Sequence, residues 1–399
     1  MAEHMLYRYN ILLWCLCLFC FGCAVPLEKP LPPLVPVSLE DCPSFQDDLD
    51  RQSLEQAALR SLEYFNRLPE IRVYKVGKAD YSVAELKESL STFLDLLRSS
   101  ASDEIFRRRI RETFDVYKSV GSDNEGRVLF TGYYAPLIDG SLEETEEYRF
   151  PVYRTPDDHI VVDLGMFREK YQGERIIARY ENGQILPYYT REDIDTDHSL
   201  RGRGLEIAWL ADPVDLFFLH IQGSGLVRLR DGTIMQISYA QANGHPYRSV
   251  GRLLIDGGKI AAEDMSLRSI KRYLREHPEE MREILNHNES YVFFRIVNEG
   301  PVGSLDVPVT AGRTIATDSS FFPKGVLAFI RTQKPVIADN GTIESWESFS
   351  RFVFNQDTGG AITGPGRVDI YCGEGDVAGI MAGHMKEVGE LYFLVKKRK

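Results

Sequence analysis

The sequence lacks the residue patterns with which proteins hold metals, nucleotides or a reactive serine. Its eight histidines show no His-Glu-x-x-His or similar close pairing. It has no Walker loop and no dinucleotide-binding glycine fingerprint after a strand, and Ser224 does not lie in a Gly-x-Ser-x-Gly turn. Asp193, Asp195 and Asp197 begin like a calcium loop, but His198 replaces the required glycine. We therefore expect no metal, no cofactor and no serine nucleophile.

Cysteine is scarce beyond the N-terminus. Four of the six cysteines lie at or before Cys23, which leaves only Cys42 and Cys372. Their spacing fits no metal-ligand pattern, and the sequence does not show whether they lie close enough for a disulfide. Cys372 is expected either to pack as a small apolar side chain or to make the activity sensitive to oxidation.

Basic residues are outnumbered, with 47 Lys and Arg against 59 Asp and Glu and a formal charge of −12. Nucleic-acid partners are not expected, because a phosphate backbone needs a basic surface patch. The only basic cluster is the C-terminal run from Lys396 to Lys399. We interpret this run as a solvated tail, with a weak contact to an anionic polymer or membrane as the alternative.

The first forty residues predict export. After Arg8 the chain reads ILLWCLCLFCFGCAVP, which is too short to cross a bilayer and suits a signal peptide over residues 1–22. Gly22-Cys23 resembles a bacterial lipobox, in which the cysteine is lipidated, although Cys20 replaces the usual leucine. A conventional signal peptide cut elsewhere and an uncleaved anchor stay open. Residues 23–40 hold five prolines and are expected to form an extended linker.

The rest of the chain has the composition of a globular protein, with 43% apolar and 27% charged residues, and its length suits two domains. Apolar spacing predicts helices over residues 44–67, 82–97, 103–120 and 265–286. Elsewhere short strands with glycine punctuation predominate, without βαβ alternation. This pattern predicts a mainly β fold, barrels or sandwiches with helices packed outside.

Three aspartates near the C-terminus are the candidates for chemistry. Asp318 in IATDSSFFPKG, and Asp357 and Asp369 in QDTGGAITGPGRVDIYCGEG, each follow a strand-like run and precede small residues. A partly buried carboxyl group beside another carboxylate has a raised pKa and is able to serve as a general acid near neutral pH. The structural alternative is that each aspartate merely caps a turn.

Asp357-Thr358-Gly359 has the spelling of an aspartic protease, but the rest of the chain argues against one. Such enzymes need two aspartates that share a proton, from two lobes or two subunits. The chain has a single Asp-Thr-Gly, and only about forty residues follow Gly359, too few for the small domain of a homodimeric protease.

Six blocks in this order resemble the membrane-bound lytic murein transglycosylase A family, and the last two resemble its module named for three aspartates. They are FTGYYAP (130–136), RGRGLEIAWLADPVDLFFLHIQGSG (201–225), YAQANGHPYRSVGRLLIDGGKI (239–260), SYVFFRI (290–296), GRTIATDSSFFPKG (312–325) and QDTGGAITGPGRVDIYCGEGDVAGIMAG (356–383). The resemblance implies a double-psi β-barrel catalytic domain with helices from residues 41–136 and 297–399. It also implies a smaller β-barrel inserted over residues 137–296, with a glycan-binding groove between the two.

The resemblance also implies a reaction and its residues. The family cleaves the β-1,4 bond between N-acetylmuramic acid and N-acetylglucosamine without water, so the enzyme is a carbon–oxygen lyase that leaves 1,6-anhydromuramic ends. Asp369 is the implied acid and base, with Asp357 and Asp318 as supporting carboxylates. The substrate-binding residues expected in the recognised blocks are Thr131, Tyr133, Tyr134, Gln222 and Ser224.

Location and partners follow from the same resemblance. We expect a lipoprotein anchored through Cys23 at the periplasmic face of the outer membrane, acting on peptidoglycan strands beside cell-wall synthesis or division proteins. The alternatives left open are a peptidoglycan-binding barrel protein without activity and, less favoured, a hydrolase or aspartic protease. The sequence does not distinguish exo from endo cleavage.

Overall fold

The computed structural model describes residues 32–398. The expected signal peptide (residues 1–22), the lipidation candidate Cys23 and the first part of the linker lie outside the described residues. Within residues 32–398, no helix is both long and apolar enough to cross a membrane. Cys42 and Cys372 lie in the described part and are both free thiols.

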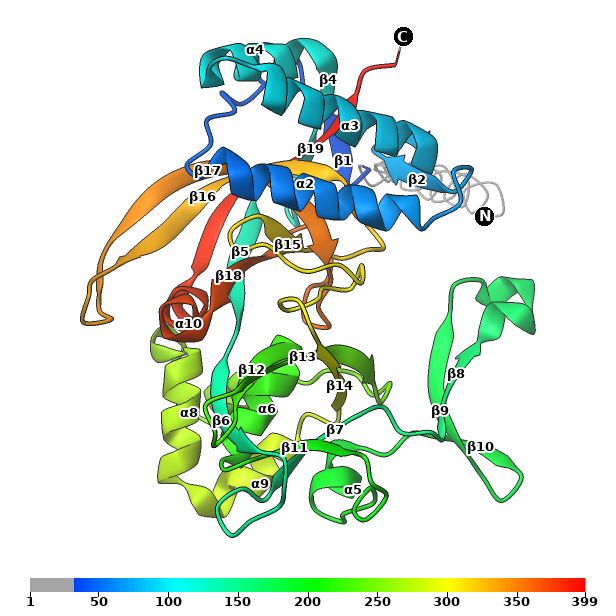
Figure 1. Ribbon diagram of the computed structural model, residues 1–399, viewed down its shortest axis with the longest axis vertical. Coiled ribbons are helices and arrows are strands. Elements are labelled where there is room, and N and C mark those ends of the chain that lie inside the picture. Colours follow the sequence, from blue (N-terminus) through cyan, green and yellow to red (C-terminus); the bar gives the residue numbers. More distant parts are fainter. Residues whose placement is uncertain (1–31, 399) are drawn as a thin grey trace, which may run out of the picture. The chain divides into compact units, whose positions relative to one another are not determined.

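Six strands close into a barrel that joins distant parts of the chain (Figure 1). Around the ring they are β5 (Val128–Ala135), β18 (Arg367–Glu374), β15 (Thr314–Ala316), β17 (Ile343–Asp357), β16 (Leu327–Ile337) and β19 (Lys386–Lys396), and β19 pairs back with β5. The pairs β5–β18 and β15–β17 are parallel and the others antiparallel. β4 (Phe114–Ser119) and β1 (Leu34–Pro36) extend the sheet beyond β19.

Three N-terminal helices pack on this barrel: α2 (Arg51–Asn66), α3 (Val83–Ser99) and α4 (Asp103–Thr113). Each begins at a side chain that accepts a hydrogen bond from the first turn, namely Asp50, Ser82 and Ser102. Their apolar faces meet the barrel through aromatic rings, with Phe93 of α3 centred 5.5 Å from Phe352 of β17. This core buries the inner faces of the barrel strands.

The third predicted helix is too long. It ends at Thr113, and residues 114–119 form β4, which pairs with β19 and β1. Phe114 and Val116 are buried while their neighbours are less so, which is the two-residue period of a strand. The first helix is also shorter than predicted, since it begins at Arg51 rather than near residue 44.

A second six-stranded sheet comes from the middle of the chain. Its order is β14 (Val292–Val297), β13 (Ile234–Ala242), β12 (Ser224–Arg228), β6 (Leu137–Ser141), β11 (Glu206–Leu210) and β7 (Phe150–Tyr153). A bridge between Arg154 and Phe294 brings the β7 edge back to β14. The predicted fold class, mainly β with N-terminal helices, a barrel and a smaller inserted barrel, is thus confirmed.

The middle of the chain contains more helix than the single predicted stretch. The helices there are α5 (Arg191–Asp195), α6 (Pro213–Gln222), α7 (Val250–Asp256), α8 (Leu267–Glu276) and α9 (Pro278–Asn286), and α10 (Gly375–His384) follows in the C-terminal part. The predicted helix over residues 265–286 breaks at Pro278, which begins α9. Missed helix α6 carries its own signals: Asp212 caps it, Pro213 opens it and Gly223 closes it with φ of 75°.

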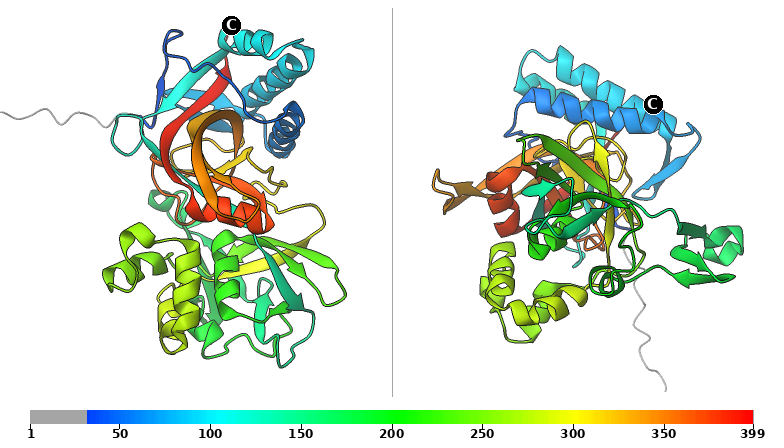
Figure 2. Two further views of the ribbon diagram at one scale, coloured as in Figure 1. Left: turned by 90° about the vertical axis from the view of Figure 1, so that its left-hand side faces the viewer. Right: turned by 60° about the horizontal axis from the view of Figure 1, so that its bottom comes forward.

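A three-stranded sheet projects from the second six-stranded sheet, in both Figure 1 and the right panel of Figure 2. It consists of β8 (His159–Asp163), β9 (Arg175–Glu181) and β10 (Gln184–Pro187), with short 3-10 turns η1 (Leu164–Met166) and η2 (Glu169–Tyr171) between the first two. The remaining small elements are the hairpin of β2 (Val73–Val76) and β3 (Ala79–Ser82) and the turn η3 (Ala262–Asp264).

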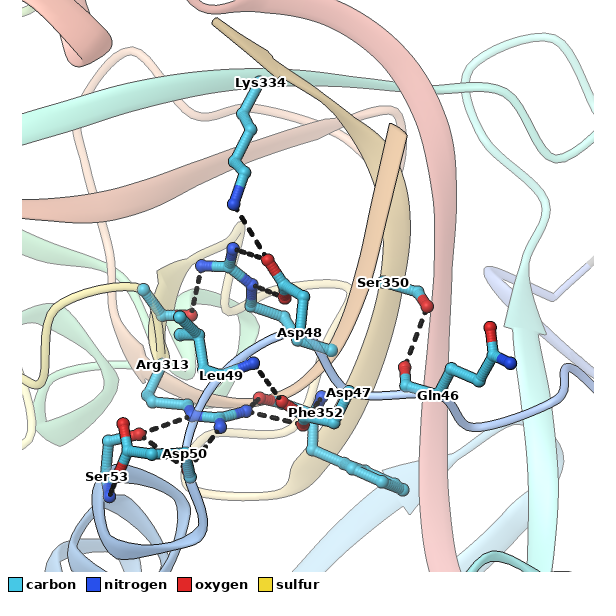
Figure 3. Close-up of polar contacts among 12 residues, drawn as sticks. Gln46, Asp47, Asp48, Leu49, Asp50, Ser53, Arg313, Lys334, Ser350 and Phe352 are labelled. Carbon is cyan, nitrogen blue, oxygen red and sulfur yellow. Dashed lines mark hydrogen bonds and ion pairs between the residues drawn. The ribbon is translucent and has the colours of Figure 1, made fainter. Parts of the chain in front are cut away.

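Two aspartates ahead of α2 tie the N-terminal segment to the barrel (Figure 3). Asp47 lies 2.6 Å from a guanidinium nitrogen of Arg313, which is fully buried and also donates to the Asp50 carbonyl. Asp48 receives two hydrogen bonds from Arg351, at 2.8 and 2.7 Å, and one from Lys334 at 2.9 Å. These ion pairs add to the apolar anchoring of the same segment by Phe45, which is 1% exposed and whose ring lies 5.1 Å from that of Phe329.

Candidate active site

Asp369 lies in the middle of β18, between β5 and β15. Its register partners are Thr131 on β5 and Ala316 on β15. The neighbours Val368 and Ile370 are buried in the barrel core, so the alternation of the strand turns Asp369 to the opposite face. The strand thus holds the carboxyl group on a rigid element.

The surroundings of Asp369 favour its neutral form. The Thr131 hydroxyl donates a hydrogen bond to the Asp369 carboxylate, and the Arg367 guanidinium lies 3.6 Å from the same oxygen. Burial raises the pKa of Asp369, the charge of Asp357 raises it further, and Thr131 and Arg367 only partly oppose this. A carboxyl group of this kind is able to donate a proton and then accept one.

Asp357 ends β17 and is held by three donors. They are the Tyr133 hydroxyl at 2.8 Å, the Ser304 backbone N–H at 2.9 Å and the Thr358 backbone N–H at 2.8 Å. Burial nevertheless raises the pKa of Asp357. Burial also lowers the pKa of the Lys324 ammonium, and the Asp357 charge is the largest influence opposing it. The carboxyl groups of Asp357 and Asp369 form a pair: both residues are only partly exposed, and the charge of Asp357 raises the pKa of Asp369.

Asp318 has a different environment. Its carboxylate accepts hydrogen bonds from the backbone and hydroxyl of Ser320 and, at 2.8 Å, from the Gly364 backbone N–H. Burial disfavours its charge, but these hydrogen bonds outweigh burial and hold the pKa of Asp318 below its usual range. The residue joins the turn after β15 to the loop that precedes β18.

The two adjacent tyrosines point to opposite faces of β5, as expected for strand neighbours. Tyr133 reaches Asp357, and its ring lies 5.2 Å from that of Tyr371. Tyr134 is 8% exposed and packs against Ala378 and Ala382 of α10. The structure thus brings Tyr133, rather than Tyr134, to the carboxyl pair.

The other two predicted substrate-binding residues lie at the end of α6 and on β12 of the second six-stranded sheet. Gln222, at the end of α6, accepts a hydrogen bond from the Tyr134 backbone N–H at 3.0 Å. Ser224 opens β12 and is 5% exposed, paired in register with Ser238. Gln222 thus links α6 to β5, whereas the side chain of Ser224 is buried.

A cleft of about 660 Å³ lies beside Asp369, and both the barrel strands and helices from the middle of the chain contribute to it. Thr131, Tyr134 and Arg367 line it from the barrel side, and Phe218 and Gln222 line it from α6. Residues 262–267 and 382–386 complete the walls. Thr131 and Arg367, which line the cleft, both contact the carboxyl group of Asp369.

Sequence reasoning missed Arg367. It stands two residues before Asp369 on the same strand, so alternation places both on one face. Its terminal nitrogen lies 3.3 Å from the Thr131 hydroxyl oxygen, and its Nε is buried with no hydrogen-bond partner in the described part of the chain. The two-residue spacing would have identified Arg367 as a neighbour of the acid.

Cys372 lies on β18, three residues after Asp369, and its sulfur packs closely against Gly132 of β5. A Cβ atom at Gly132 would lie 2.8 Å from its sulfur and 2.7 Å from the Ala382 Cα, so only glycine lets β5, β18 and α10 pack this closely. Burial raises the pKa of Cys372 to about 12, which leaves little thiolate at neutral pH.

Side chains of the types that hold metal ions do not gather in the described part of the chain. Across residues 32–398, no group of three or more His, Cys, Asp or Glu side chains is placed to hold a metal ion. In the suspected calcium loop, the Asp193 carboxylate accepts hydrogen bonds from Thr190, the N-cap of α5, and Asp195 pairs with buried Arg191 at 3.3 Å. The carboxylates of that loop are thus used in local structure.

Comparison with known proteins identifies the family of this chain. Residues 129–295 match the family model described as the MltA specific insert domain, and residues 313–395 match the 3D domain. The membrane-bound lytic murein transglycosylase A of Escherichia coli (strain K12) is 32% identical over 289 residues, which cover 70% of this chain and 69% of that protein. The enzyme of the same name from Vibrio cholerae is 32% identical over 277 residues, covering 69% and 67%.

Solved structures agree with the sequence relatives. A membrane-bound lytic murein transglycosylase from Agrobacterium tumefaciens superposes with a TM-score of 0.75 and 31% identity, covering 91% of this chain and 97% of that one. E. coli MltA with bound chitohexaose gives a TM-score of 0.69 and 26% identity, with 93% and 96% covered. The chain belongs to the membrane-bound lytic murein transglycosylase A family.

Proposed function

We propose that this lytic transglycosylase cleaves the MurNAc–GlcNAc bond of peptidoglycan with Asp369 as its single acid and base. The observation that carries the proposal is the position of Asp369: its carboxyl group is only 20% exposed, has a raised pKa and contacts Thr131 and Arg367, which line a cleft of about 660 Å³. Its relatives are named lytic murein transglycosylases, and one was crystallised with chitohexaose, a chain of β-1,4-linked amino sugars.

The first step is proton donation. Neutral Asp369 protonates the oxygen that links the two sugars, and the bond to muramic C1 breaks as positive charge develops on the ring. Thr131, hydrogen-bonded to the carboxyl group, fixes its orientation. Because burial disfavours the charge of Asp369 and raises its pKa, the protonated form that this step requires is favoured.

The second step returns the proton. The muramic C6 hydroxyl attacks C1, and the Asp369 carboxylate takes the hydroxyl proton, which restores the acid and leaves a 1,6-anhydro ring. Water is not a reactant, so a second carboxylate to activate it is unnecessary. Arg367, at 3.6 Å, stabilises the carboxylate during the interval between the two proton transfers.

Asp357 and Asp318 support this site in different ways. Three donors surround Asp357, so we assign it the negative charge of the carboxyl pair, which stabilises the positive sugar ring and keeps Asp369 protonated. Asp318 positions the loop before β18 through Gly364. Among the predicted contacts, Thr131, Tyr134 and Gln222 line the cleft, and Tyr133 acts through Asp357.

The domain division and the location are part of the same proposal. Residues 41–136 and 297–399 form the catalytic domain, and residues 137–296 form the inserted domain. The membrane-bound relatives imply that the protein acts in the cell envelope. Lipidation of Cys23 at the outer membrane would be checked by palmitate labelling of the wild type and a Cys23→Ala variant, with label expected only in the wild type.

Mass spectrometry of digested peptidoglycan tests the reaction. The purified protein is expected to release muropeptides one water lighter than those of a hydrolase. Asp369→Asn is expected to release none, and Asp339→Asn, at an exposed turn, is the matched control with full activity. Hydrated products from the wild type, or full activity of Asp369→Asn, would contradict the proposal.

A further inference from the structure

A second cleft, of about 740 Å³, continues the one beside Asp369. The two clefts share four lining residues, which are Tyr134, Leu267, Gly383 and His384. Tyr134 lies on β5, Leu267 at the start of α8, and Gly383 and His384 at the end of α10, so the two clefts adjoin at these elements. Asn340 and Gly341, at the tip of the β16–β17 hairpin, border its other side.

Four basic side chains of α8 line this second cleft: Arg268, Lys271, Arg272 and Arg275. Figure 1 shows α8 below α10, on the side of the molecule from which the β16–β17 hairpin extends. Such a concentration is unusual in a chain with a formal charge of −12. Two of the four are neutralised from α6, because Lys271 lies 2.7 Å from Asp215 and Arg275 lies 2.6 Å from Asp212.

Arg268 and Arg272 are the other two, and they are exposed. Neither takes part in an ion pair with any residue in the described part of the chain. Glu276 and Asp376 also line the cleft, and neither is within ion-pair distance of these arginines. The two guanidinium groups are therefore free to bind an anion that enters the cleft.

The positions of Arg268 and Arg272 destabilise α8. Arg268 and Arg272 are one turn apart, where like charges repel each other. Arg268 also lies in the first turn, at the positive end of the helix dipole, and that turn contains no acidic residue. An anion bound between the arginines and the start of the helix would relieve both effects.

We propose that Arg268 and Arg272 bind the carboxylates of the peptide stems that the glycan strand carries. This inference rests on the proposed function, because it takes the strand beside Asp369 to be peptidoglycan. The muramic sugars carry peptides with free carboxylates that extend away from the glycan. Guanidinium groups recognise carboxylates through paired hydrogen bonds. The second cleft is thus a stem-binding subsite that lies beyond the reacting sugars.

The test compares two substrates that differ only in the stems: soluble uncross-linked strands with peptides, and the same strands after an amidase has removed them. The double variant Arg268→Gln/Arg272→Gln is expected to raise the KM for stem-bearing strands about five- to tenfold, because two exposed ion pairs are lost. Its kcat is expected to stay unchanged, since neither arginine touches the reacting atoms. On stripped strands the KM is expected to change less than about twofold.

The matched control is Arg108→Gln/Arg282→Gln, which removes the same charge from exposed positions on α4 and α9. It is expected to leave both KM values as in the wild type. An equal rise on both substrates, no rise, or the same rise in the control would overturn the inference. Arginine-dependent binding to phosphatidylglycerol vesicles, without an effect on strands, would also overturn it, in favour of a membrane surface.

A binding measurement separates this inference from the proposed reaction. Asp369→Asn proteins with and without the two arginine substitutions are titrated with both kinds of strand. If the wild type cleaves neither substrate, the proposed function fails, but stem-dependent binding that needs Arg268 and Arg272 still supports the subsite. If the wild type cleaves both and binding does not depend on the arginines, only the subsite fails.

Discussion

Asp48 and Asp369 each lie beside an arginine of a barrel strand, yet the two pairs have opposite properties. Arg351 donates twice to Asp48, at 2.8 and 2.7 Å, and Lys334 adds a third bond. Burial disfavours the charge of Asp48, but Arg351 and Lys334 outweigh it and hold its pKa below the usual range. Arg367 remains 3.6 Å from Asp369, and burial raises the pKa of that group.

The difference shows that an arginine nearby does not by itself hold an aspartate as an anion: at Asp48 the direct ion pairs outweigh burial, whereas at Asp369 burial outweighs the more distant arginine. Asp48 is fully hydrogen-bonded as an anion and stabilises the attachment of the N-terminal segment. At Asp369 the desolvation of the carboxyl group is only partly compensated, so its pKa is raised and its protonated form is favoured. The predictions below test this distinction, from the largest effect to the smallest.

The largest effect is expected on activity. Asp369→Asn is expected to lower kcat/KM for peptidoglycan by about a thousandfold or more, because the only acid and base is lost. Asp48→Asn is expected to retain kcat/KM within about threefold under conditions where it is folded, since the residue serves stability. Rates of anhydromuropeptide release, followed by liquid chromatography, measure both. Comparable losses in the two variants would erase the distinction.

The next effect concerns stability alone. Arg313→Met removes the partner of Asp47 and leaves a partly buried carboxylate without its ion pair. The free energy of unfolding is expected to fall by about 3–5 kcal/mol, as for other broken buried ion pairs. Denaturant titration measures this change. Arg331→Met, whose side chain is 56% exposed in its pair with Glu390, is the control and is expected to change stability by less than about 1 kcal/mol.

The two aspartates are expected to affect stability with opposite signs as the pH changes. The pKa of Asp48 is lower when folded, so its contribution is full above the unfolded pKa and is lost as the pH falls through the folded value. Asp48→Asn is therefore expected to destabilise the protein by about 1–3 kcal/mol at neutral pH and less in acid.

Asp369 behaves in the reverse way, because its folded pKa is raised. The burial of its charge costs stability above the folded pKa, and this cost disappears as the pH falls. Asp369→Asn is thus expected to stabilise the protein by about 1 kcal/mol at neutral pH, with no gain in acid. Unfolding curves at a neutral pH and near pH 4 measure both variants. A neutral-pH loss of stability in Asp369→Asn would show that its carboxylate is well compensated.

A smaller effect is expected from Arg367. Its charge lowers the pKa of Asp369, so Arg367→Gln is expected to raise that pKa further and to move the alkaline limb of kcat/KM to higher pH. The maximal rate is expected to fall about tenfold or less, because the Asp369 carboxylate loses a stabilising charge. Arg367→Lys keeps a charge and is expected to restore most of the profile. A loss of rate without movement of the alkaline limb would indicate a purely structural role.

Much of the candidate site could be predicted from the sequence because it lies on strands. The alternation that buries Val368 and Ile370 turns Asp369 outward, and the same rule gives Tyr133 and Tyr134 opposite faces. The sequence did not predict helices such as α6 in the middle of the chain, for a different reason. In α6 the run Leu216 to Leu219 is buried on all sides, so it shows no helical period, and only the capping residues mark its ends.

Other features depend on contacts between distant segments, and no local pattern contains them. The compensation of Asp48 by Arg351 joins residues 303 positions apart. The three aspartates follow similar strand-like runs in the sequence, and this similarity hides the difference between Asp318, whose pKa is lowered by Ser320 and Gly364, and Asp357 and Asp369, whose pKa is raised. Only the packing around each carboxyl group determines which of them is a candidate acid.

Carbon-13 NMR of aspartate carboxyl groups tests the central contrast most directly. Protein labelled at the aspartate side-chain carboxyl carbon is titrated with acid, and Asp48→Asn and Asp369→Asn spectra assign the two signals. The account predicts a midpoint for Asp369 above the ordinary aspartate value of about 3.9 and a midpoint for Asp48 below it. A midpoint for Asp369 at or below the ordinary value would contradict its assignment as the acid of this enzyme.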